Sequence, residues 1–121
     1  AVIKTGVIWG IWHAPMIALG HNYGFGYFGY PWTGVALMTL FCMGFGCFLS
    51  WLTLRTGSAV PAALAHAGLN AVAGLGLTVC LPGYDALLGP LPMGALGMLP
   101  ALLAGALCCA ALARGTGERR P

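Results

Sequence analysis

Charged residues are almost missing from this sequence. Only 6% of the 121 residues are Asp, Glu, Lys or Arg, whereas soluble domains contain roughly 25%. Three of the five basic residues lie at or after position 114, so no basic face can follow a phosphate backbone. These numbers exclude a nucleic-acid-binding protein. Together with 60% hydrophobic residues, they predict a membrane protein whose main partner is the lipid bilayer.

Metal-binding signatures are also missing. The five cysteines, at positions 42, 47, 80, 108 and 109, have no CxxC spacing. We therefore expect them to be small apolar thiols inside the membrane. The sequence has no HExxH motif, in which two histidines on one helix face bind zinc.

Long apolar segments, in contrast, occur four times. They lie at residues 3–19, 33–54, 59–80 and 93–113, and each has about the ~20 residues that a helix needs to cross a bilayer. We expect Gly57 to end the second helix and Ser58 to cap the third. The expected fold class is an all-α membrane protein, a multi-pass transmembrane bundle with about four helices.

The few basic residues predict the orientation of this bundle. With four spans, Lys4, Arg55 and Arg114 all fall on one side of the membrane, together with the two arginines of the C-terminal tail. The positive-inside rule makes this side the cytoplasm. We therefore expect a multi-pass protein of the cell membrane with a cytoplasmic C-terminal tail. The aromatic segment 23–32 should lie at the opposite surface as an interfacial belt.

Two histidines interrupt the apolar segments. His13 lies in WGIWH (residues 9–13) and His66 in HAGLN (residues 66–70). An ionisable side chain inside a membrane is costly, so it usually has a partner or a function. At 1.5 Å per residue, His13 lies roughly 13 Å beyond Lys4 and His66 roughly 12 Å beyond Ser58. This similar depth predicts one shared polar cavity.

Asn70 follows His66 by four residues, a spacing that places both on one helix face. The small residues of segment 59–80, among them Gly68 and Gly74, favour close packing against neighbouring helices. The polar pair can then face the interior of the bundle. We interpret His21, in the expected outer loop, as an ordinary polar residue and Trp9 as a packing residue.

The two histidine motifs resemble those of the CPBP intramembrane protease family, which is also called the CAAX prenyl protease, bacteriocin-processing or lysostaphin-resistance-protein-A-like family. The first motif has an aromatic residue, three further residues and His, here Trp9 and His13, although the family more often has Phe at the first position. The second is LRTGSAVPAALAHAGLN (residues 54–70), which ends with His66 and Asn70. The resemblance covers most of residues 5–75.

This resemblance implies an intramembrane endopeptidase that acts on membrane-associated peptide or protein substrates, such as prenylated proteins or bacteriocin precursors. In the implied site a glutamate activates water with help from His13, while His66 and Asn70 donate hydrogen bonds to the oxyanion. The family also has a Glu-Glu-x-x-x-Arg motif upstream of both histidines, and residues 1–121 do not contain it. We therefore expect residues 1–121 to be the C-terminal portion of a larger protease-like transmembrane domain.

Three alternatives remain at the level of sequence. A metal-dependent protease would use His13 and His66 as zinc ligands, although we favour a site without a cofactor. A haem protein could use the same two histidines as axial ligands. A non-catalytic membrane scaffold or peptide-binding protein would need no glutamate. The oligomeric state is left open.

Overall fold

The computed structural model describes residues 1–80, 83–89 and 91–117, and every regular element in these ranges is an α-helix. In chain order the helices are α1 (Val2–Trp12), α2 (Ala14–Ala18), α3 (Trp32–Thr56), α4 (Val60–Val79) and α5 (Leu99–Gly117). The expected all-α class is confirmed for the described part of the chain.

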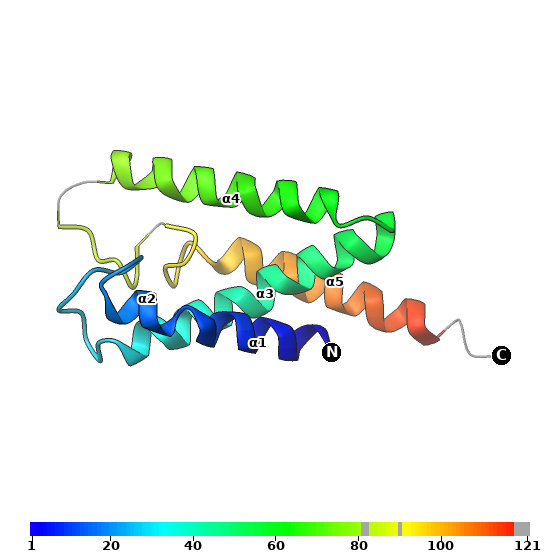
Figure 1. The fold of residues 1–121 in the computed structure, drawn as a ribbon, viewed down its shortest axis with the longest axis horizontal. Coiled ribbons are helices and arrows are strands. Elements are labelled where there is room, and N and C mark those ends of the chain that lie inside the picture. Colours follow the sequence, from blue (N-terminus) through cyan, green and yellow to red (C-terminus); the bar gives the residue numbers. More distant parts are fainter. Residues whose placement is uncertain (81–82, 90, 118–121) are drawn as a thin grey trace.

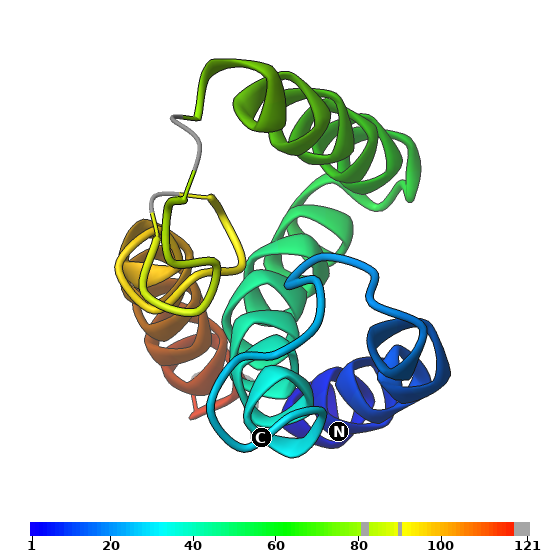
Figure 2. The ribbon, with the colours of Figure 1, turned by 90° about the vertical axis from the view of Figure 1, so that its left-hand side faces the viewer.

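Helix α3 is the centre of the fold. Helices α1 and α5 pack along it, and α4 leans against it at the top of Figure 1. Viewed along the bundle in Figure 2, α4 is set apart from α1 and α5. The core forms around α3 and contains the buried side chains of Ile17, Tyr23, Met38, Phe41, Cys42, Phe45 and Met98.

Glycines allow α1 to approach α3 closely. Gly6 and Gly10 are both buried on α1. A Cβ added at Gly6 would lie 2.7 Å from the Cα of Met43, and one added at Gly10 would collide with the backbone of Thr39. Their four-residue spacing is the small-xxx-small pattern of closely packed membrane helices. The α1–α3 contact, which fixes the position of His13, therefore depends on these two residues.

Substitution of Gly10 by Ala should destabilise the fold by about 1 to 3 kcal/mol, because the added methyl group overpacks the contact with α3. The matched control is Gly68→Ala on α4, where an added Cβ meets no atom within 4 Å and Ala has the better helix propensity. Thermal unfolding in detergent measures both variants. Equal unfolding temperatures would contradict the close α1–α3 approach.

The expected packing of α4 is wrong. None of its residues with a described burial is buried, and within the described ranges α3 is the one helix whose backbone packs against it. Gly68 and Gly74 face open space, so they do not mediate a close helix contact. The glycines that do so lie on other helices, at the α1–α3 contact and at the contact of Gly44 with Gly105 between α3 and α5.

Two expected helix boundaries also differ from the structure. The first helix is not continuous, because α1 ends at Trp12 and α2 begins at Ala14. Pro15 has no N–H to donate to the carbonyl of Ile11, and the N–H of His13 donates to Gly10 instead, at 3.1 Å. The last helix begins at Leu99 rather than 93, since the described residues from 91 to 98 form turns.

The α3–α4 connection is close to the expected one. Gly57 ends α3 in the left-handed region at φ 68°, and its N–H donates to the carbonyl of Thr53 at 2.9 Å. The expected helix end is confirmed. The hydroxyl of Ser58 accepts a hydrogen bond from the N–H of Val60 at 3.2 Å, although the N-cap position of α4 is Ala59. The expected N-cap residue, Ser58, therefore lies one position before the observed N-cap.

Within the described residues, α3 is the helix that is both long and apolar enough to cross a membrane, while residues 60–76 and 99–114 form shorter apolar helices. Figure 1 shows the start of α1, the end of α5 and the α3–α4 turn toward one end of the bundle. Lys4 in the first turn of α1 and Arg55 and Arg114 in the last turns of α3 and α5 therefore share this end.

The aromatic segment at the other end is only partly exposed. Phe28 and Trp32 are exposed, at 89% and 74%, as a belt would be, but Tyr23 is buried at 4%. Burial raises the pKa of Tyr23 above its ordinary value, and the protonated phenol donates a hydrogen bond to the carbonyl of Met93 at 2.8 Å. This bond ties the segment after α2 to the segment before α5.

The cysteines are not all free thiols, as had been expected. Cys47 on α3 and Cys109 on α5 form a disulfide, with their Cα atoms 5.8 Å apart. Cys42, Cys80 and Cys108 are free, and Cys42 is buried. The disulfide joins two helices that also meet at Gly44 and Gly105.

Candidate functional site

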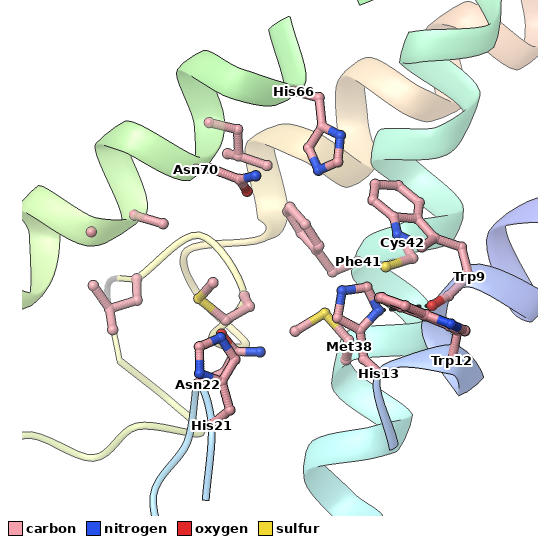
Figure 3. Close-up of a pocket in the computed structure, with 15 residues that line it drawn as sticks. Trp9, Trp12, His13, His21, Asn22, Met38, Phe41, Cys42, His66 and Asn70 are labelled. Atoms are coloured by element: carbon pink, nitrogen blue, oxygen red, sulfur yellow. Dashed lines mark hydrogen bonds between the residues drawn. The ribbon is translucent and has the colours of Figure 1, made fainter. Parts of the chain in front are cut away.

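A pocket of about 450 Å³ lies between α4 and the rest of the bundle. Helices α1, α3 and α4 contribute to its wall, together with the segments that follow α2 and precede α5. Its polar lining residues are His13, His21, Asn22, His66 and Asn70. Figure 3 shows the two expected histidines and the asparagine projecting toward this common space.

His13 is presented by the break between α1 and α2. Its Nδ1 lies 2.8 Å from the carbonyl oxygen of Trp9. A carbonyl oxygen only accepts hydrogen bonds, so Nδ1 carries the proton and donates it. Whenever the ring is neutral, its Nε2 atom keeps a lone pair that can accept a proton from a substrate or a water molecule. Trp12 contacts the same ring edge-on, with centroids 5.4 Å apart.

His66 and Asn70 lie one turn apart on α4, as their spacing predicts. His66 is half-buried and Asn70 is exposed. Trp9 contacts the His66 ring edge-on at 5.2 Å, and Phe45 does so at 6.3 Å. No side-chain hydrogen bond joins either residue to another described residue, and Figure 3 shows both side chains directed toward the pocket.

Sequence reasoning missed His21 and Asn22. His21 was taken for an ordinary polar loop residue, yet both line the pocket, and Figure 3 shows them side by side. The N–H of Tyr23 donates to the carbonyl of His21 at 2.9 Å, and Asn22 between them has φ 69°. This is a tight, strained turn for a residue other than glycine. The asparagine among glycines in GHNYG was the available signal.

The remainder of the wall is apolar and includes Met38, Phe41, Leu69 and Met93. None of the described residues that line the pocket is Asp, Glu, Lys or Arg. The carboxylate of Asp85, which does not line the pocket, accepts hydrogen bonds from the N–H groups of Leu87 and Leu88, at 2.8 and 3.0 Å. Glu118 lies outside the described residues.

A catalytic zinc ion usually takes three protein ligands. The described residues contain no group of three or more His, Cys, Asp or Glu side chains placed to hold a metal ion. His13 and His66 alone are therefore an incomplete zinc set. A haem bound by the same histidines would have to share its space with the indole of Trp9, which contacts both rings.

Comparison with protein families identifies the chain. The family model described as type II CAAX prenyl endopeptidase Rce1-like matches residues 1–72, which is more than half of the 121 residues. The chain belongs to the Rce1-like family. This agrees with the resemblance seen in the two histidine motifs. No curated protein and no solved structure matches the sequence.

The Rce1-like match contains His13, His66 and Asn70 and ends within α4. Leu91 and Met93, which also line the pocket, lie beyond it. Membership assigns the chain to a family of membrane-associated endopeptidases. The roles of individual residues must be argued from their chemistry.

Proposed function

We propose that this chain forms the catalytic pocket of an intramembrane endopeptidase that hydrolyses peptide bonds of membrane-associated, prenylated or bacteriocin-like substrates. One observation carries the proposal. His13 from the α1–α2 break and His66 and Asn70 from α4 line the same pocket, although more than fifty positions separate His13 from His66 in the sequence. The family match supports the reaction class.

His66 and Asn70 suit the role of an oxyanion hole. The amide of Asn70 is a neutral donor at any pH at which the fold exists, and a neutral imidazole donates through one nitrogen. Both residues lie on the face of α4 that lines the pocket. Donors already in place for a developing oxyanion are worth about 3 to 4 kcal/mol each. These two hydrogen bonds would lower the activation free energy of peptide hydrolysis.

His13 suits proton transfer. The proton on Nδ1 is held by the carbonyl of Trp9, so Nε2 can orient a water molecule or accept a proton from it. General acid–base catalysis of this kind contributes about 10²- to 10⁴-fold. Peptide hydrolysis also needs a general base that activates water, and Asp85 is engaged in its turn. The proposal therefore includes a further glutamate, that of the family's upstream Glu-Glu-x-x-x-Arg motif.

The proposal places the pocket in a multi-pass protein of the cell membrane, with α3 as one span. Lys4, Arg55 and Arg114 lie at one end of the bundle, and the positive-inside rule makes this end cytoplasmic. A reporter enzyme fused after Arg114 should accordingly be active in the cytoplasm. A fusion after Phe28 is the matched control and should be active on the other side. The same reading from both fusions would contradict this topology.

We expect catalysis to be independent of a metal ion, since the proposed site uses His13 for proton transfer and His66 as a hydrogen-bond donor, and residues 1–121 contain no HExxH motif. Incubation with a strong chelator should leave the rate of peptide cleavage within a factor of about two, well below the roughly tenfold or larger losses typical of disturbed metal sites. Loss of activity that added zinc restores would contradict this expectation.

The test of the function is cleavage of a lipid-anchored fluorogenic peptide by the native protein in vesicles. Wild type should cleave it, and His66→Ala should lower turnover by about 10²-fold or more. A non-catalytic peptide-binding protein is the alternative, favoured by the lack of acidic residues among the described lining residues. That protein would bind the peptide without cleaving it.

A further inference from the structure

Trp9 contacts both histidines of the pocket. Its indole meets the His66 ring edge-on, with centroids 5.2 Å apart and the planes at 78°. It also packs against the His13 ring at 6.0 Å and 55°. The other tryptophan of the pocket, Trp12, has a ring contact with His13 at 5.4 Å and none with His66. Trp9 is thus the tryptophan shared by the two rings.

The backbone of Trp9 acts on His13 as well. In a continuous helix, the carbonyl of Trp9 would accept a hydrogen bond from the backbone N–H of His13. That N–H donates to Gly10 instead, because the helix breaks before Pro15. The carbonyl is left to accept the proton of the imidazole Nδ1 at 2.8 Å. The helix break therefore selects the tautomer of His13.

The contact with His66 spans two helices that otherwise do not pack together. Within the described residues, α4 packs against α3 and makes no backbone contact with α1. The side chain of Trp9 crosses this gap from α1 and meets His66 beside Phe45, whose ring lies 6.4 Å from the indole. Edge-to-face pairs of this kind have a preferred geometry, so the indole restricts the orientation of the His66 ring.

We propose that Trp9 is a positioning residue, which holds the rings of His13 and His66 in one fixed relative orientation. The proposal rests on the proposed function for its effect on catalysis, but the orientation itself does not depend on any reaction. The carbonyl sets the tautomer of His13, and the indole fixes both rings. In this role Trp9 acts through the two histidines and not on the reacting atoms.

Nuclear magnetic resonance of the imidazole nitrogens and ring protons, in the detergent-solubilised chain, tests this placement without substrate. Trp9→Leu should shift the signals of both His13 and His66, while the tautomer of His13 stays the same, because the backbone carbonyl of residue 9 is kept. Trp12→Leu should shift the signals of His13 alone. Trp51→Leu is the matched control, since Trp51 contacts Arg55 at 6.0 Å and does not line the pocket. It should shift neither histidine.

Trp9→Phe keeps a smaller aromatic ring, so the signals of His13 and His66 should return part of the way to their wild-type positions. A loss of packing volume alone does not predict this partial return. Trp9→Phe also provides the answer if the leucine variant does not fold. Unchanged His66 signals in Trp9→Phe and Trp9→Leu would overturn the proposal. So would equal effects of Trp9→Leu and Trp12→Leu on His66.

Catalysis supplies the second measurement. Misplacement of reacting groups by about 1 Å can cost ~10²-fold in rate, so Trp9→Leu should lower kcat by about 10- to 100-fold with little change in KM, and Trp9→Phe should recover most of the loss. A change in KM alone would overturn the positioning role. If wild type cleaves no peptide while the signals shift as expected, the proposed function fails and the placement by Trp9 stands.

Discussion

Replacement of His13 by Ala is expected to lower the turnover of a lipid-anchored peptide by about 10²- to 10⁴-fold. The reason is the free Nε2 atom, which the hydrogen bond from Nδ1 to the Trp9 carbonyl leaves facing the pocket. Among the other described lining residues, His21 is the imidazole that could also accept a proton, and Figure 3 shows it away from His66 and Asn70. The measurement is the initial cleavage rate at saturating peptide in vesicles.

His21→Ala is the matched control for His13→Ala. It removes the same side chain from the same pocket, but from the loop after α2, away from His66 and Asn70 in Figure 3. We expect it to retain turnover within about tenfold, short of the 10² lower bound for loss of an acid–base group. Equal losses in the two variants would contradict a specific role for His13.

Asn70→Ala is expected to lower turnover by about 10²- to 10³-fold while substrate affinity and thermal stability stay nearly unchanged. An oxyanion donor is used in the transition state and not in the bound ground state, so its removal lowers kcat and leaves KM almost constant. The exposed position of Asn70 makes a large effect on folding unexpected.

The same variant distinguishes catalysis from structure. If Asn70 were an interhelical hydrogen-bonding residue, Asn70→Ala would cost roughly 0.6 kcal/mol of stability and little activity. His66→Ala, measured in parallel, gives the reference for a lost donor on the same helix face. Near-normal turnover of Asn70→Ala beside an inactive His66→Ala would rule out a catalytic Asn70.

Local patterns predicted the parts of the fold that depend on neighbouring residues. The end of α3 at Gly57 followed from its capacity for a left-handed conformation, and the shared face of His66 and Asn70 followed from helix periodicity. The matched depth of His13 and His66 predicted that they would meet in one cavity, and both line the same pocket. The break at His13 was also readable from Pro15, but the apolar run concealed it.

Features that depend on distant segments could not be predicted in the same way. The spacing of Cys47 and Cys109, 62 positions apart, says nothing about which helices lie together. The place of His21 in the pocket depends on Tyr23, which reaches across to Met93. The open space beside α4 depends on which helix faces pack against other segments. The small size of Gly68 and Gly74 does not show whether their face of the helix is packed.

The central claim is that His13, His66 and Asn70 together hydrolyse a peptide bond, and the direct measurement is isotope incorporation. The native protein in vesicles is incubated with a lipid-anchored peptide in heavy-oxygen water, and the products are analysed by mass spectrometry. The account predicts one heavy oxygen in the newly formed carboxylate with wild type, and almost no product with His13→Ala, His66→Ala or Asn70→Ala. Labelled product formed at the wild-type rate by all three variants would contradict it, as would a bound peptide that wild type never cleaves.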